Sequence, residues 1–160
     1  MFDLNRFLKT HPKLTYTLIR FLTGVVFLGE GIQKFLYAEI RGAGRFEKMG
    51  FPYPEFTGTL VGSFEVLAGV LLLLGLFTRF GAAIVFVIMS VAVVTIKIPI
   101  LLGESFGPFV LRDLSHYGFW AMLHEGRTDF SMLICSTFIL WEGAGKYALD
   151  TVLLRNRENN

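Results

Sequence analysis

Four long apolar runs constrain the fold of this chain more than any other feature. They cover about residues 14–37, 56–77, 81–102 and 130–149. Each holds about 20–24 residues, the length that a helix rising 1.5 Å per residue needs to cross roughly 30 Å of hydrocarbon. Apolar and polar residues do not alternate within them, which favours helices over strands. The sequence therefore predicts an all-α fold, a polytopic membrane protein built as a four-transmembrane-helix bundle.

Composition supports a location in lipid. Hydrophobic residues make up 53% of the 160 residues, and a soluble domain of that length would lack the polar surface to cover them. The lipid bilayer is therefore the first expected partner. A formal net charge of +2 gives no basic surface for nucleic acid, and the single Cys135 excludes a disulfide framework or a paired-cysteine redox motif.

The whole chain, residues 1–160, is expected to form one membrane domain with outer loops at 38–55 and 103–129. Charged residues interrupt the first run, so we expect a retained span rather than a cleaved signal. Seven basic residues near span ends share a side with both termini, against five in the outer loops, so both termini are predicted to be cytoplasmic. The seven are Arg6, Lys9, Lys13, Arg79, Lys146, Arg155 and Arg157.

Charged residues inside the apolar runs are the first candidates for function. A charge at the bilayer centre costs about 2.5–3.5 kcal/mol on insertion scales, so we expect these residues to face the bundle interior and to pair. Their depths along the helices suggest that Arg20 meets Glu142 and that Glu30 meets Lys97. The candidate polar core consists of Arg20, Glu30, Lys34, Glu65, Lys97 and Glu142.

Most of these charges lie on helical stripes of small or weakly polar residues. Spacings of three and four residues put the members of each stripe on one helix face, and small residues let membrane helices approach closely. We expect the four stripes to face one another. They are Arg20, Gly24, Phe27, Gly31 and Lys34; Gly58, Gly62, Glu65, Gly69 and Leu72; Ala83, Phe86, Ser90, Val93 and Lys97; and Ser131, Cys135, Phe138, Glu142 and Gly145.

Glu65 is the most informative of these residues because it lies nearest the expected midplane, with no cation at its own depth. In one interpretation, Arg20 or Lys34 stretches toward Glu65 and the pair only ties helices together. In the other, a midplane carboxyl serves as a proton relay or as a ligand-binding group. The sequence leaves both interpretations open.

The stripe of the first run resembles the first helix of the DoxX family of small bacterial and archaeal membrane proteins. The ending Gly143-Ala144-Gly145-Lys146-Tyr147-Ala148-Leu149-Asp150 is similar to the ending of that family, apart from Ala144 and Ala148. The resemblance implies a four-helix protein of the cytoplasmic (inner) membrane of a bacterium or archaeon. It also implies a link to redox chemistry, because some relatives are membrane subunits of thiosulfate:quinone oxidoreductases. The matching motif positions are Gly24, Phe27, Gly31, Gly69, Arg79, Gly145, Lys146 and Asp150.

A redox- or quinone-linked membrane subunit is therefore the favoured function, as a non-catalytic subunit rather than a stand-alone enzyme. The polar stripes would polarise or protonate a quinone carbonyl, with Phe27 and Phe138 flanking its ring. No covalent cofactor and no metal are expected, since the histidines lie outside the apolar runs and one cysteine cannot hold an iron–sulfur cluster. A soluble or membrane oxidoreductase partner would then supply the electrons.

Two alternative functions without a redox role stay open. The same polar core suits a bundle that transports or binds a small ligand, although no inverted repeat is visible. The outer connection 103–129 suits an assembly or interaction partner, because long structureless loops are often functional; within it, residues 116–124 are apolar enough for a short interfacial helix. Small-residue faces such as Gly58-x-x-x-Gly62 also suit contacts between copies in a homo-oligomer.

Overall fold

The computed structural model describes residues 14–158. Arg6, Lys9 and Lys13, three of the basic residues used to predict the orientation of the chain, lie outside this range. Within that range the regular structure is helical, and the prediction of an all-α fold is confirmed. An isolated bridge between Phe106 and Phe109 is the one strand-like pairing in the described part of the chain.

Within residues 14–158, three helical segments are long and apolar enough to cross a membrane. They are α2 (Leu14–Leu36), α4 (Pro54–Leu74) and the continuous stretch Thr78–Leu102. The ends of these three segments lie within one helical turn of the ends of the first three predicted runs. The short helix α3 (Ala43–Lys48) stands in the connection between α2 and α4.

The third of these segments is not a uniform α-helix. It divides into α5 (Thr78–Ala92), the π-helical η1 (Val93–Lys97) and α6 (Ile98–Leu102). Proline has no N–H to donate to the preceding turn, and Pro99 stands just after the widened π turn.

The predicted stripe on this run is wrong in part. The π turn adds a residue between α5 and Lys97 and so changes which face of α5 lies in line with Lys97. Phe86 is exposed, whereas Gly81, Ala82 and Val85 are buried along α5. Lys97 is buried as predicted, together with Thr95 of the same π turn.

The fourth predicted run, 130–149, differs most from the structure. Its helix, α8, spans Arg127–Glu142 and ends at Gly143, which has a φ of 88° that side chains rarely adopt. An irregular segment, residues 143–148, follows before α9 (Leu149–Glu158). The 16 residues of α8 fall short of membrane-spanning length.

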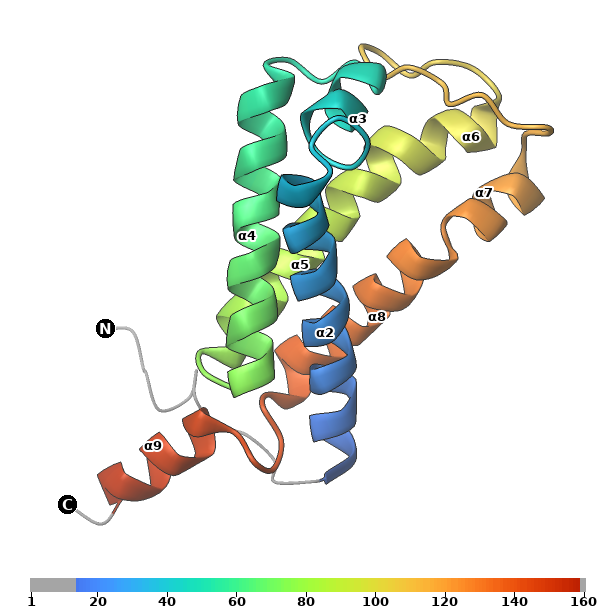
Figure 1. Ribbon diagram of the computed structural model, residues 1–160. Helices are drawn as coiled ribbons and strands as arrows, with labels where there is room; N and C mark the ends of the chain where they lie inside the picture. The colour runs from blue at the N-terminus through green and yellow to red at the C-terminus, as the bar shows by residue number, and fades with distance from the viewer. Residues whose placement is uncertain (1–13, 159–160) are drawn as a thin grey trace.

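A short helix, α7 (Phe119–Glu125), leads directly into α8 and overlaps the predicted interfacial helix at 116–124. Gly126 between them keeps a helical backbone, so α7 and α8 form one bent helical stretch (Figure 1).

Close packing of α2 against α4 forms the densest interface of the bundle. A Cβ built on Gly31 would meet the backbone nitrogen of Val66 at 2.7 Å, and one on Gly69 would meet the nitrogen of Leu28 at 2.5 Å. All members of the two stripes predicted for α2 and α4 are buried. On α8 the buried positions are Met132, Ser136 and Ile139, one residue later than predicted, so Ser131 is exposed.

The helices form two pairs that diverge toward one end of the molecule. α5 packs against α8, while α2 and α4 stand upright beside them (Figure 1). Phe27, Leu72, Val85 and Ile139 join the pairs in a common core. The end where the pairs diverge carries α3 and the two long connections; we call it the loop end.

Candidate functional site: a polar cavity at the loop end

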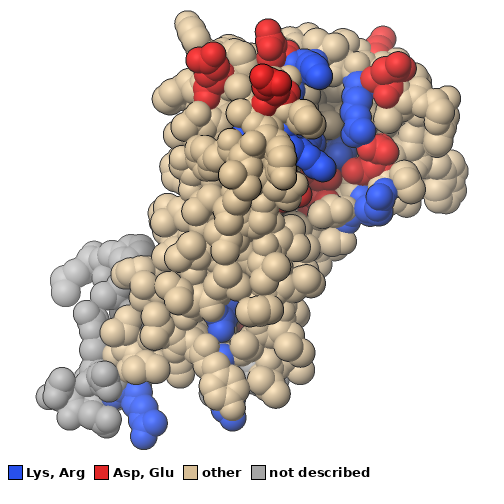
Figure 2. All heavy atoms as spheres, viewed as in Figure 1, with Lys and Arg blue, Asp and Glu red and all other residues tan. Residues whose placement is uncertain are grey.

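A cavity of about 390 Å³ lies where the helix pairs diverge. Phe27 of α2, Val61 of α4, Ile88 of α5 and Met132 of α8 contribute to its mainly apolar walls. Figure 2 shows basic and acidic side chains gathered over the loop end, whereas the middle of the same face carries few. The polar residues lining the cavity are Glu30, Lys34, Arg41, Arg45, Glu65, Thr95, Thr128 and Asp129.

The two outer connections meet at this end of the cavity. The rings of Phe46 and Phe51, which both line it, lie 5.2 Å apart, and Phe51 is 5.1 Å from Phe109 of the second connection. The amide of Val110 also donates to the carbonyl of Met49 at 3.2 Å. These contacts join residues of both connections beside the cavity.

Lys34 and Glu65 form a buried ion pair in the cavity wall. Nζ of Lys34 lies 2.6 Å from Oε2 of Glu65, and the two side chains are only 8% and 5% exposed. The glycines of the α2–α4 interface allow this approach, because a Cβ on Gly62 would already lie 3.2 Å from Cβ of Lys34. Of the two candidate partners of Glu65, Arg20 and Lys34, it is therefore Lys34 that pairs with the carboxylate. The pair both joins two helices and borders the cavity.

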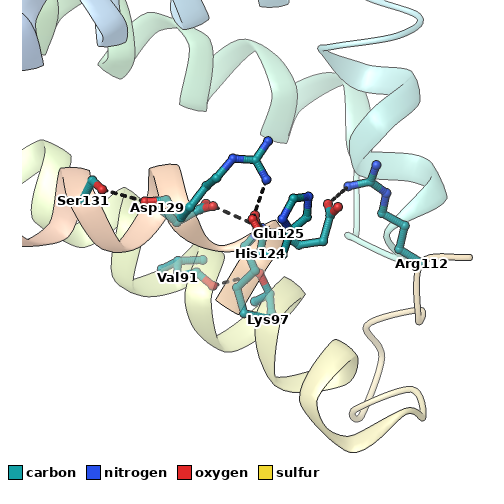
Figure 3. A network of polar contacts seen from close by, with 9 residues as sticks. Val91, Lys97, Arg112, His124, Glu125, Asp129 and Ser131 are labelled. Atoms are coloured by element: carbon teal, nitrogen blue, oxygen red, sulfur yellow. Dashed lines mark hydrogen bonds and ion pairs between the residues drawn. The ribbon is translucent and has the colours of Figure 1, made fainter. Parts of the chain in front are cut away.

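A second ion pair, between Lys97 and Asp129, joins η1 to α8. Nζ of Lys97 lies 3.1 Å from Oδ2 of Asp129 and donates to the backbone carbonyl of Glu125 at 2.8 Å (Figure 3). Glu125 in turn accepts from Arg112 at 2.9 Å. The predicted pairing of Lys97 with Glu30 is wrong, because Lys97 meets the first turn of α8.

Sequence reasoning missed Asp129 as a site residue. It was assigned to the outer loop, although an acid at a predicted helix start is a signal for the favourable end of a helix dipole.

Glu30, Arg41 and Arg45 complete the polar lining. Glu30 and Arg45 lie close enough to Glu65 to interact with it electrostatically. Within residues 14–158, Arg41 and Arg45 form no ion pair. The cavity lining therefore holds two further cations, Arg41 and Arg45, and a half-buried carboxylate, Glu30, in addition to the buried ion pair.

Arg20 lies at the opposite end of the bundle and plays a different part. It is fully buried, and its guanidinium donates to the carbonyls of Ala144 at 2.9 Å, Tyr147 at 3.0 Å and Leu73 at 3.1 Å, and also to that of Leu72. The prediction that Arg20 meets Glu142 is wrong, because the chain leaves the helix at Gly143 and presents carbonyl oxygens instead. Arg20 thus ties α2 to the end of α4 and to segment 143–148.

Two predicted site residues of α8 lie away from the cavity. Glu142 and Phe138 line a shallow groove on the outer face between α5 and α8, together with Phe86 and Trp141. Phe138 also makes an edge contact with the ring of Tyr16, the centroids being 5.0 Å apart. Of the two predicted ring-flanking residues, only Phe27 borders the cavity.

The C-terminal motif positions build a helix cap. Asp150 accepts from the amides of Phe77 at 2.8 Å and Thr78 at 2.9 Å, which satisfies free N–H groups at the start of α5. Gly145 has a φ of 73°, which favours glycine. The ammonium of Lys146 lies 5.2 Å above the ring of Tyr147.

The remaining motif positions pack helices. Arg79 donates to the carbonyl of Trp141 at 3.1 Å and so joins α5 to α8. A Cβ on Gly24 would meet the side chain of Leu73 at 3.0 Å, so this glycine also serves the α2–α4 contact. Within residues 14–158, no three His, Cys, Asp or Glu side chains are placed to hold a metal ion.

Several apolar helices of membrane length, packed around a mainly apolar cavity with a buried ion pair in its wall, define an integral membrane protein. The chain belongs to the DoxX family, whose model matches residues 15–98. Uncharacterized membrane protein Rv3486 of Mycobacterium tuberculosis is 45% identical to it over 132 residues, which cover 82% of this chain and 77% of that protein. CatD of Bacillus subtilis, named as a candidate oxidoreductase, is 24% identical over 143 residues, 89% of each chain. No solved structure matches the chain.

Proposed function

We propose that this protein is a quinone-linked membrane subunit whose cavity holds the ring of a quinone or quinol. The observation that carries the proposal is the buried Lys34–Glu65 pair in the wall of an otherwise mainly apolar cavity. Pockets for ligands of this size measure about 300–1,000 Å³ and combine apolar walls with a few placed polar groups. A volume of about 390 Å³ suits a flat ring and the start of its tail.

The residues of the cavity match the functional groups of such a ligand. Lys34 donates hydrogen bonds and suits a ring carbonyl, whereas the carboxylate of Glu65 suits a ring hydroxyl. Phe27 supplies an apolar wall, and Glu30 gives a second carboxylate in the cavity lining. The ligand would supply the two-electron chemistry, and the protein would bind, orient and exchange protons with it.

The position of the cavity supports entry from the bilayer. Val87 and Val91 of α5 line the cavity, yet 58% and 46% of their surfaces are exposed. These valines therefore border both the cavity and the outside of the bundle. An apolar tail would therefore leave the cavity past them without crossing the polar loop end.

The electrons would pass between the quinone and an oxidoreductase partner. The candidate polar core contains no redox group, so the protein would serve as a non-catalytic subunit rather than a stand-alone enzyme. The name of CatD supports a redox setting for the family.

The contacts of the bent stretch α7–α8 support a fourth membrane crossing. Residues at the bend between α7 and α8 meet Lys97 at the loop end, and the segment after α8 meets Arg20 at the opposite end. Four crossings would place both termini on one side, and the exposed basic residues Lys146 and Arg155 at that end favour the cytoplasm of an inner membrane. Residues 1–160 would then form a single membrane domain.

Quinone binding in nanodiscs tests this function. The full chain would be reconstituted with a defined mole fraction of a long-tailed quinone, and binding would be measured by the quenching of intrinsic fluorescence and by extraction. The test variant is Lys34→Met/Glu65→Leu, which removes both charges and leaves neither unpaired. The control is Ser63→Ala, an exposed position on α4.

We expect saturable binding by the wild type and by Ser63→Ala, and at least tenfold weaker binding by the double variant, which corresponds to about 1.4 kcal/mol. Absence of binding by the wild type, or equal binding by the folded double variant, would contradict the proposal.

A further inference from the structure

The last helix, α9, carries an apolar face that the described residues leave uncovered. Leu149, Val152 and Leu153 are 43%, 54% and 46% exposed, and their spacing of three and four residues puts them on one side of the helix. Thr151 lies on the opposite side, and Arg155, two residues beyond Leu153, points away from Leu153 at the border of the apolar side next to Val152. The helix is therefore amphipathic, and its apolar side does not contribute to the core of the bundle.

The orientation of α9 is fixed by its first turn. Asp150 accepts from the amides of Phe77 and Thr78, and its own amide donates to the carbonyl of Gly75 at 2.9 Å. These contacts hold the start of α9 against the turn between α4 and α5. From there the helix projects obliquely outward, away from the bundle, instead of continuing α8 (Figure 1).

The surroundings of α9 identify what covers its apolar face. Trp141 and Tyr147, at the same end, are both largely exposed, and such aromatic residues gather where hydrocarbon meets headgroups. Lys146, whose ammonium lies over the ring of Tyr147, and Arg155 of α9 are exposed as well, and their positive charge suits anionic headgroups. A helix that leaves the end of membrane-spanning helices sideways, with an apolar side and exposed basic residues near it, has the arrangement of an interfacial helix.

We infer that α9 is an interfacial helix that binds the anionic lipid surface at this end of the bundle. Leu149, Val152 and Leu153 lie among the upper acyl chains, while Arg155 lies among the headgroups or in water. Through Asp150, α9 fixes the depth of the α4–α5 turn relative to that surface. The inference is independent of the quinone proposal.

Site-directed spin labelling of the full chain in nanodiscs tests the arrangement. Cys135, the single cysteine, is replaced in a Cys135→Ser background. Labels are then placed by Leu153→Cys and Arg155→Cys, with Ile134→Cys on the outer face of α8 as the lipid reference and Glu104→Cys as the aqueous reference. Accessibility to oxygen, which concentrates in lipid, is compared with accessibility to a water-soluble nickel chelate.

In nanodiscs containing phosphatidylglycerol, we expect the oxygen-to-nickel ratio at position 153 to approach that of position 134 and to exceed that at 155 several-fold. We expect the contrast between 153 and 155 to decrease in pure phosphatidylcholine, where the attraction to anionic lipid is lost. Equal ratios at 153 and 155, close to that of position 104, would overturn the inference and place α9 in water. Protection of 153 from both reagents with spin–spin broadening would overturn it in favour of a second copy.

Discussion

Lys34 and Glu65 show how one buried contact serves both stability and binding. Each side chain is less than a tenth exposed, so the loss of one partner leaves the other charge largely buried. Removal of one member of a buried pair typically costs about 3–5 kcal/mol, whereas apolar replacement of both is often neutral. The pair therefore holds α2 against α4 while its polar atoms remain beside the cavity.

This asymmetry gives a prediction for single and double variants. Lys34→Met alone should lower the free energy of unfolding by about 3–5 kcal/mol, because Glu65 loses its cation. Lys34→Met/Glu65→Leu should recover most of that loss. Reversible unfolding in mixed micelles measures both, with Ser63→Ala as the control. Strictly additive effects of the two replacements would contradict this account of the pair.

Arg20 allows a sharper prediction because its role depends on the shape of its side chain. A guanidinium donates from three nitrogens in a fixed plane, and Arg20 uses all three on backbone carbonyls. Arg20→Lys keeps the charge but cannot reach the same set, and each charged hydrogen bond contributes about 1.5–3 kcal/mol. We therefore expect a loss of at least about 3 kcal/mol in unfolding free energy.

In Arg20→Lys we also expect faster proteolysis of segment 143–148, because two of the carbonyls that accept from Arg20, those of Ala144 and Tyr147, belong to this segment. Arg155→Lys, an exchange at an exposed position, is the matched control. A wild-type cleavage pattern in Arg20→Lys would show that charge alone suffices.

At the scale of elements, glycine position decides how closely α2 and α4 approach. A Cβ on Gly69 would meet the backbone of Leu28 at 2.5–2.7 Å, whereas a Cβ on Gly29 meets nothing within 4 Å. Gly69 therefore stands against the backbone of α2, whereas Gly29 faces open space.

Alanine at these two glycines should have opposite effects. Gly29→Ala should stabilise the fold by up to about 1 kcal/mol through helix propensity. Gly69→Ala should destabilise it by about 1–3 kcal/mol, because the backbones must separate to admit the methyl group. Unfolding free energies of the two variants test this, and a Gly69→Ala protein as stable as Gly29→Ala would refute the close approach.

The same elements show what can be predicted from sequence. The stripes of α2 and α4 were predictable because glycines at spacings of three and four mark a close helix contact. The end of α8 was not, since Gly143, Ala144 and Gly145 are apolar enough to extend the run, although the positive φ of two of them breaks it. The partner of Lys97 also depended on a π turn, which hydropathy does not reveal.

For the whole molecule, the proposed four crossings predict where reagents reach the chain. In the Cys135→Ser background, Glu104→Cys at the loop end should react with an impermeant maleimide in intact cells. Lys146→Cys should react only after permeabilisation, because four crossings put it on the other side. Labelling of both positions in intact cells would contradict a fourth crossing by α7–α8.

The contacts of Arg20 also constrain how the protein is made. This residue enters the membrane with the first helix, yet two of its acceptors, on Ala144 and Tyr147, stand 124 and 127 residues further along. During synthesis the guanidinium therefore lacks these two acceptors until the ribosome has added residues 144–147. Only then can the bundle close at that end, so a chain that stops before Ala144 leaves the guanidinium with the carbonyls of Leu72 and Leu73 as its remaining acceptors.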